Sequence, residues 1–137
     1  MRSLGLDLGT KTLGIAISDK LGFIASTYKT IFFNDGAYDE LLQPIKDIIQ
    51  LENIENIILG FPKNMNNTIG VRAQETLDYK EKLESFLGRK VILIDERWTS
   101  VQANNLLIKA DMSRKKRKKT VDKVAATFIL QAYLDKK

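Results

Sequence analysis

The segment Leu4-Gly5-Leu6-Asp7-Leu8-Gly9-Thr10 places one carboxylate in the middle of an apolar strand pattern. An ionised aspartate among leucine side chains loses hydration, so we expect a cation, a donor array or a metal ion to compensate Asp7. Gly5 and Gly9 carry no side chain, which leaves room for a ligand or another backbone to approach closely. The segment therefore predicts a strand with a site at its edge.

Two more strands follow this segment after short turns. The three predicted strands span residues 3–8, 13–18 and 23–31. Because turns this short join antiparallel neighbours, the three strands are expected to form an antiparallel meander.

The rest of the chain alternates between helical and strand patterns. Helices are predicted over residues 38–51, 71–87 and 120–134, with a further helix through Ala103, Leu106 and Leu107. Short apolar runs predict buried strands at residues 57–59 and 91–94, and a polar loop is expected at 63–70. Elements in this order predict an α/β fold, with a five-stranded mixed sheet covered by helices on both faces.

Composition narrows the possible functions. The 137 residues suffice for one hydrophobic core, so residues 1–137 are expected to form a single domain. The absence of cysteine and histidine excludes disulfides, thiolate or imidazole metal sites and imidazole bases, so an enzyme of this composition depends on carboxylates. With no signal-peptide pattern and no apolar run of about eighteen residues, we expect a soluble, cytoplasmic protein without a membrane partner.

The net charge of +5 is concentrated in one segment. Six consecutive cations form the run Arg114-Lys115-Lys116-Arg117-Lys118-Lys119, and the rest of the chain is nearly neutral. We expect this basic run to be a loop that docks on a polyanion at a defined place. The alternative is an ordinary solvated loop, because such runs also occur on plain surfaces.

Three carboxylates fall on separate predicted elements: Asp7 on the first strand, Glu96 at the end of the last strand, and Asp122 on the C-terminal helix. Clustered carboxylates repel one another, so such a trio persists when it binds cations or protons. Ligand sets made of oxygen atoms favour Mg²⁺ or Mn²⁺. Two such ions, about 3.5–4 Å apart, can stabilise the attacking and leaving oxygens when a phosphodiester is displaced in line.

Each carboxylate also has a structural interpretation. Asp7 can belong to a turn network at the end of its strand, and Glu96 can form an ion pair with Arg97. Asp122 can stabilise the first turn of its helix through the helix dipole. Asp95 is expected to be structural, because a continuing strand would point it away from the face of Glu96.

Four motifs follow one another along the chain. They are Asp7-Leu8-Gly9-Thr10-Lys11-Thr12-Leu13-Gly14-Ile15-Ala16-Ile17-Ser18-Asp19, Gly60-Phe61-Pro62-Lys63-Asn64-Met65, Asp95-Glu96-Arg97-Trp98-Thr99-Ser100 and Val121-Asp122-Lys123-Val124-Ala125-Ala126. Together they resemble the YqgF/RuvX family, whose fold is ribonuclease H-like. The resemblance covers nearly the whole chain, and four motifs in order are far more specific than any one of them.

The resemblance implies a hydrolase that cleaves phosphodiester bonds. Asp7, Glu96 and Asp122 match the family's acidic triad, which implies that they are catalytic and bind Mg²⁺ or Mn²⁺, in a two-metal site, to leave a 5′-phosphate and a 3′-hydroxyl. The family is described as nucleases that trim precursor 16S ribosomal RNA and as Holliday junction resolvases. The leading interpretation is processing of the 5′ end of this RNA in ribosome biogenesis, with structured RNA and ribosomal particles as partners.

The resolvase interpretation implies DNA junctions as the substrate instead. A resolvase normally works as a symmetric homodimer, whereas a monomer suffices for RNA trimming. Lys11 and Arg97 are candidate phosphate contacts in either case, as is the basic run 114–119. Their alternative is solvation or pairing with the acidic cluster.

Two positions depart from the family's usual pattern. The run Asn66-Asn67-Thr68 stands where the family commonly has an Asp-Gly pair, which changes the ligand contacts expected of that loop. Trp98 replaces a smaller aliphatic residue and either packs inside the protein or stacks on a base. Neither departure affects the acidic triad.

Two other classes of protein compete with a nuclease. The motif Asp7-Leu8-Gly9-Thr10 also opens actin-like ATPases and sugar kinases, but those proteins close two domains around a nucleotide and this chain has room for one. A non-catalytic module that docks through its basic run is the other class. Such a module has no reason to carry all three carboxylates.

Overall fold

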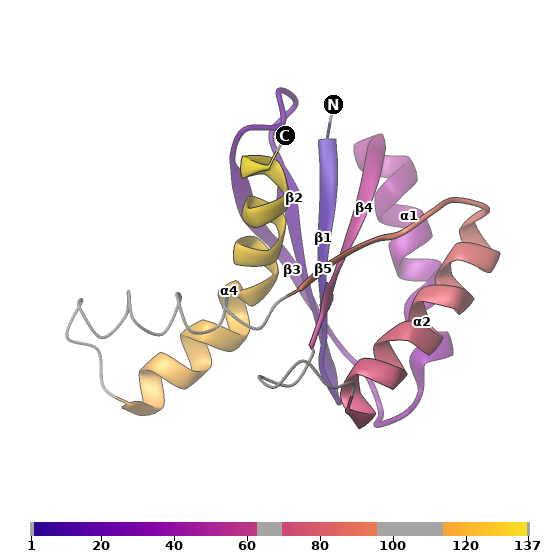
Figure 1. Ribbon diagram of the computed structural model, residues 1–137, viewed down its shortest axis with the longest axis vertical. Coiled ribbons are helices and arrows are strands. Elements are labelled where there is room, and N and C mark those ends of the chain that lie inside the picture. Colours follow the sequence, from indigo (N-terminus) through magenta and orange to yellow (C-terminus); the bar gives the residue numbers. More distant parts are fainter. Residues whose placement is uncertain (1, 63–69, 96–113, 137) are drawn as a thin grey trace.

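The computed structural model describes residues 2–62, 70–95 and 114–136, with residues 114–124 described by their backbone alone. Five strands form one sheet (Figure 1): Arg2–Leu8 (β1), Thr12–Ser18 (β2), Ala25–Phe32 (β3), Ile54–Phe61 (β4) and Ile92–Asp95 (β5). Their order in the sheet is β3-β2-β1-β4-β5. The first three strands pair antiparallel, whereas β4 is parallel to β1 and β5 is parallel to β4. The predicted mixed sheet with an antiparallel meander is confirmed.

Helices cover both faces of this sheet, as predicted (Figure 1). One face carries the 3₁₀ helix Tyr38–Leu41 (η1) and the helices Leu42–Glu52 (α1) and Val71–Leu87 (α2), and the other carries the helix Arg114–Asp135 (α4). The helix predicted through Ala103, Leu106 and Leu107 lies outside the described residues. In the described part of the chain, no helix has the length and apolar character needed to cross a membrane.

Two strands begin at least two residues from their predicted starts, whereas the other three begin within one residue of theirs. β3 starts at Ala25 because the Asp19 carboxylate accepts hydrogen bonds from the backbone N–H groups of Phe23 (2.8 Å) and Ile24 (3.0 Å), which keeps both residues in the turn. β4 starts at Ile54, earlier than predicted, because Asn53 ends α1 in the left-handed conformation (φ 55°) and the chain enters the sheet at once.

The basic run was expected to be a loop, and this prediction is wrong. α4 begins at Arg114, so residues 114–119 form its first turns. Lysine and arginine are good helix formers, and neither glycine nor proline interrupts the chain from residue 114 to residue 135. The later turns of α4 are held against the sheet, and extending an existing helix is far easier than starting one. These effects outweigh the repulsion between neighbouring cations, which is only a few tenths of a kcal/mol per pair.

The sheet separates two apolar clusters. The cluster under α1 and α2 contains large side chains from β1 and β2, together with residues of the helices, among them Leu4, Leu6, Leu8, Leu13, Ile15, Ile45, Tyr79 and Leu83. The cluster under α4 contains Ala16, Ile58, Ile94, Ala126, Ile129 and Leu130. The leucines of the opening segment therefore all face α1 and α2, and the residues between them face α4.

Gly5 lies where α4 comes closest to the sheet. A Cβ atom at this position would stand 2.7 Å from the Cβ of Leu130 and 3.1 Å from the carbonyl oxygen of Ala126. Real Cβ atoms essentially never approach another atom to 2.7 Å, and 3.1 Å is tighter than most real Cβ contacts, so the packed helix would have to shift. Of the two possibilities expected at Gly5, a ligand or another backbone, the structure shows another backbone.

Gly5→Ala should destabilise the protein by about 1–3 kcal/mol, because the added methyl group overpacks the contact between β1 and α4. Urea unfolding followed by circular dichroism measures this change in the free energy of unfolding. Gly14→Ala is the matched control, since it adds the same methyl group where the nearest atom lies 3.6 Å away. The control should stay within about 0.5 kcal/mol of the wild type. Equal destabilisation by both substitutions would contradict this account of Gly5.

Candidate active site

Asp7 is the penultimate residue of β1 and is half-buried. β1, β4 and β5 run parallel, so their carboxyl ends, at Leu8, Phe61 and Asp95, meet at one edge of the sheet. We call this the carboxyl edge. It is a common place for ligand sites in α/β sheets, because loops from several strands converge there.

The Asp7 side chain belongs to the face covered by α4. It follows Gly5 by two residues on β1, and Gly5 touches α4 directly. A Cβ atom at Gly14 would lie 3.7 Å from the Cβ of Asp7 and 3.6 Å from the Cβ of Ala126. Asp7 therefore stands beside the turn of α4 that contains Ala126.

Glycines flank Asp7 on both neighbouring strands. Gly14 is its partner on β2. On β4, the pairing of Leu6 with Leu59 places Gly60 beside Asp7. The row Gly14, Asp7, Gly60 thus presents one carboxylate between two positions without side chains, and a Cβ at Gly14 would occupy part of that space. This row, which we call the glycine-flanked row, leaves room for a cation next to the carboxylate.

Of the other two predicted ligands, the structure describes the backbone of Asp122 and does not describe Glu96. Asp122 lies in α4, four residues before Ala126, so its backbone is one helical turn from the residue that adjoins Asp7. Its side chain is not among those described. Glu96 follows the last residue of β5 directly and lies outside the described residues.

Asp95 ends β5 at the same edge of the sheet. Ile94 packs in the cluster under α4, so alternation along the strand places the exposed Asp95 side chain on the face of α1 and α2. This is the face opposite that of Asp7, in keeping with a structural role.

The donor chemistry of the predicted triad fits a hard divalent cation. Carboxylate oxygens are the ligands that Mg²⁺ and Mn²⁺ prefer. The described residues contain no group of three such side chains close enough to hold an ion, and that set lacks Glu96 and the side chain of Asp122. The glycine-flanked row is the structural feature that accommodates the ion at Asp7.

The cations predicted to bind nucleic acid are also placed in part. Lys11 is exposed in the turn between β1 and β2, at the carboxyl edge, and its carbonyl accepts a hydrogen bond from the N–H of Phe33 at 2.9 Å. The basic run 114–119 lies on the first turns of α4, which project away from the sheet on the side of the carboxyl edge (Figure 1). Arg97 lies outside the described residues.

Arg72 is a residue at this edge that the sequence analysis missed. It lies in the first turn of α2, and its Nη2 donates a hydrogen bond to the Leu8 carbonyl at 3.0 Å. A signal was available in the sequence, because a helix that follows a parallel strand begins at the edge where that strand ends.

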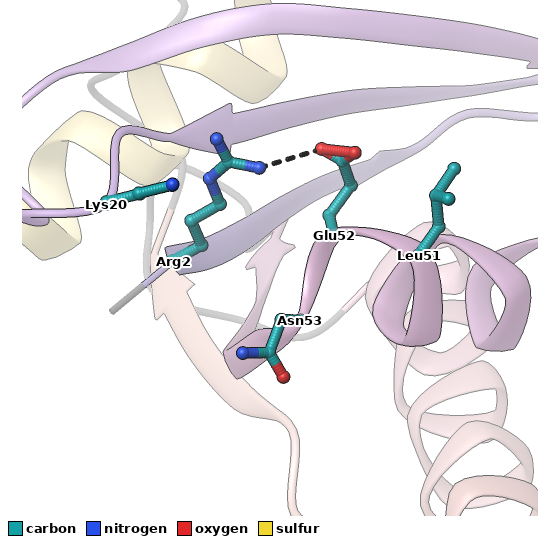
Figure 2. Close-up of a pocket in the computed structure, with 5 residues that line it drawn as sticks. All are labelled: Arg2, Lys20, Leu51, Glu52 and Asn53. Atoms are coloured by element: carbon teal, nitrogen blue, oxygen red, sulfur yellow. Dashed lines mark hydrogen bonds and ion pairs between the residues drawn. The ribbon is translucent and has the colours of Figure 1, made fainter.

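A cavity of about 560 Å³ lies at the opposite edge of the sheet, lined by Arg2, Lys20, Leu51, Glu52 and Asn53 (Figure 2). Within it, the Arg2 guanidinium pairs with the Glu52 carboxylate at 2.9 Å, which ties the start of β1 to the end of α1 (Figure 2). Asp7 lies five residue positions beyond Arg2 on β1, which is roughly 16 Å along an extended strand. This cavity is therefore distinct from the candidate active site.

Comparison with known families gives one match that spans the chain. The family model described as RuvX, Holliday junction resolvase, matches residues 1–136. A protein of Geobacillus sp. (strain WCH70) is 49% identical over 137 residues, which is 100% of this chain and 99% of the relative. A protein of Bacillus subtilis (strain 168) is 49% identical over 135 residues, or 98% of each chain. Both relatives carry pre-16S rRNA nuclease as a provisional name.

Solved structures with a similar fold include RuvC of T. thermophilus in complex with a Holliday junction substrate. It has a TM-score of 0.60 at 12% identity and covers 99% of this chain and 94% of its own. A ROK hexokinase from Thermus thermophilus has a TM-score of 0.51 at 20% identity, and the match covers 76% of this chain but only 38% of the hexokinase. At such identities the likeness shows the fold alone. The predicted ribonuclease H-like fold is confirmed.

Proposed function

The chain belongs to the RuvX family, and from this premise we propose that it is a metal-dependent nuclease that processes the 5′ end of precursor 16S ribosomal RNA. The observation that carries the proposal is the glycine-flanked row, which sets the Asp7 carboxylate at the carboxyl edge with space beside it. The provisional name of relatives 49% identical to this chain supports RNA as the substrate.

Carboxylate oxygens favour hard divalent cations, as the resemblance to the family also implies. We propose that Asp7, Glu96 and Asp122 together hold Mg²⁺ or Mn²⁺ at this edge. When bound, such ions in a two-metal site neutralise charge on the phosphate and lower the pKa of an attacking water.

The chain's own residues supply the orientation that this chemistry needs. β1 fixes the Asp7 backbone through its pairing with β2 and β4. Lys11 at the carboxyl edge and the basic run on α4 are the cations that would bind phosphates of the RNA. Holding the substrate in this way removes much of the entropic cost of bringing the reacting groups together.

Resolution of DNA junctions is the second candidate, and the description of the RuvX family as a Holliday junction resolvase favours it. A resolvase cuts two strands related by symmetry and so requires a homodimer. A monomer in solution would support RNA processing, and sedimentation measures the difference.

Asp7→Asn should abolish cleavage while the protein stays folded, because it removes a charge that binds the metal ion. The assay compares precursor 16S RNA, a matched single-stranded DNA and a four-way DNA junction, each with Mg²⁺, Mn²⁺ or EDTA. We expect the wild type to cleave only the RNA. The cleavage rate of the variant should be lower by a factor of about 100 or more, and no cleavage should occur in EDTA.

Asp95→Asn is the matched control, since it neutralises a carboxylate at the same edge on the other face of the sheet. It should retain activity within about threefold. Cutting of the junction by the wild type would favour the resolvase. Tight RNA binding without any cleavage would favour the interpretation of the protein as a non-catalytic binding module.

Replacing all six cations of the basic run with glutamine should flatten the dependence of RNA affinity on salt. Each lost phosphate contact lowers the slope of log K against log salt by about 0.7–0.9, and glutamine preserves the helix. Fluorescence anisotropy over a salt series measures the slope. Lys82→Gln with Lys90→Gln, two exposed cations on and after α2, is the control and should leave the slope unchanged. An unchanged slope in the variant with all six substitutions would show that the basic run does not contact phosphates.

A further inference from the structure

The Arg72 guanidinium is hydrogen-bonded to the residue that directly follows Asp7 in the chain. Its Nη2 donates to the carbonyl of Leu8, the last residue of β1, at 3.0 Å. Arg72 comes from α2, on the face opposite α4, and so reaches the end of β1 from the other layer of the fold (Figure 1). The guanidinium therefore lies at the carboxyl edge itself.

Among the described residues, no carboxylate side chain forms an ion pair with Arg72. Glu75, one turn later on α2, accepts a hydrogen bond from the Tyr38 hydroxyl at 2.9 Å. Burial, and then Glu75, raises the pKa of Tyr38 to about 12, so this hydroxyl keeps its proton and remains the donor. Leu8 offers a neutral oxygen to one of the five N–H groups of the guanidinium.

Arg89 shows what a purely structural arginine does in the same sheet. It lies after α2 at the opposite edge, where Nη1 donates to the Ile54 carbonyl at 3.0 Å and Nη2 donates to the Glu55 carbonyl. Both terminal nitrogens are therefore used to hold the start of β4, and the residue is half-buried. Arg72, by contrast, is exposed and donates one such bond to the described part of the chain.

We propose that Arg72 is a phosphate-binding residue that contacts the nucleic-acid backbone at the carboxyl edge beside Asp7. The planar guanidinium presents paired N–H groups that match two oxygens of a phosphate, while one N–H stays on Leu8. The bond to Leu8 fixes the position of the cation relative to the strand that carries Asp7. The inference deepens the proposed function, on which it rests for the identity of the polyanion.

The test measures binding of a single-stranded RNA of about 20 nucleotides, in EDTA so that no cleavage occurs, over a salt series. Arg72→Ala should weaken binding by about 10-fold or more and lower the slope of log K against log salt by about 0.7, the loss of one phosphate contact. Arg72→Lys should retain the slope, because it keeps the charge. Arg89→Ala is the matched control and should change neither quantity.

Three results would overturn the inference: an unchanged slope in Arg72→Ala, an equal change in Arg89→Ala, or a wild type that does not bind the RNA. Thermal unfolding checks that each variant is folded. If Arg72→Ala does not fold, Arg72→Gln replaces it, because glutamine keeps an N–H donor without the charge. The slope of log K against log salt is then measured for Arg72→Gln, with the same result expected. Since binding is measured without cleavage, a wild type that binds RNA but never cuts it would refute the proposed nuclease and leave the role of Arg72 intact.

Discussion

The close approach of α4 to β1 at Gly5 is the contact on which the rest of the site depends. Any side chain there would collide with the helix, since its Cβ would stand 2.7 Å from the Cβ of Leu130 and 3.1 Å from the backbone carbonyl oxygen of Ala126. The helix would then lie farther from the sheet, and Ala126 would lose its place beside Asp7. Because Asp122 is on the same helix, one turn earlier, the spacing between two of the three proposed ligands is set by a residue that takes no part in the chemistry.

The glycine-flanked row leaves space for a cation beside the Asp7 carboxylate, which lies within an apolar strand. A half-buried carboxylate needs compensation, and bulky neighbours would supply none while keeping a hydrated cation away. Gly14 and Gly60 remove the side chains on either side of Asp7, at the level of the sheet where three parallel strands end. The same glycines would be a weakness elsewhere in a sheet, because they contribute neither packing nor β-propensity. Beside Asp7, this loss of packing is offset by the space that the two glycines leave for a cation.

Much of the fold could be predicted from local patterns, because strands, turns and helices leave periodic signals in the sequence. The partner of Gly5 could not, because it depends on a contact with Leu130, far along the chain. The basic run was assigned to a loop from its charge, yet its helical state depends on the anchored turns that follow it. The contact of Arg72 could not be predicted either, because an arginine in a helix gives no local sign of the backbone carbonyl to which it donates. Glu96 and Asp122 stay predictions, carried by the family's motifs.

The two layers of the fold also divide the charges of the site between them. Asp7 and the helix of Asp122 lie on one face, while Arg72 reaches the same edge from the layer of α2. A cation packed on the face of Asp7 would compete with a metal ion for the carboxylate, since both are attracted to the same oxygens. A guanidinium held by a backbone carbonyl from the opposite layer avoids that competition and keeps its charge for a phosphate. A nucleic-acid backbone lying along the carboxyl edge would then meet carboxylate-bound metal on one side and arginine on the other.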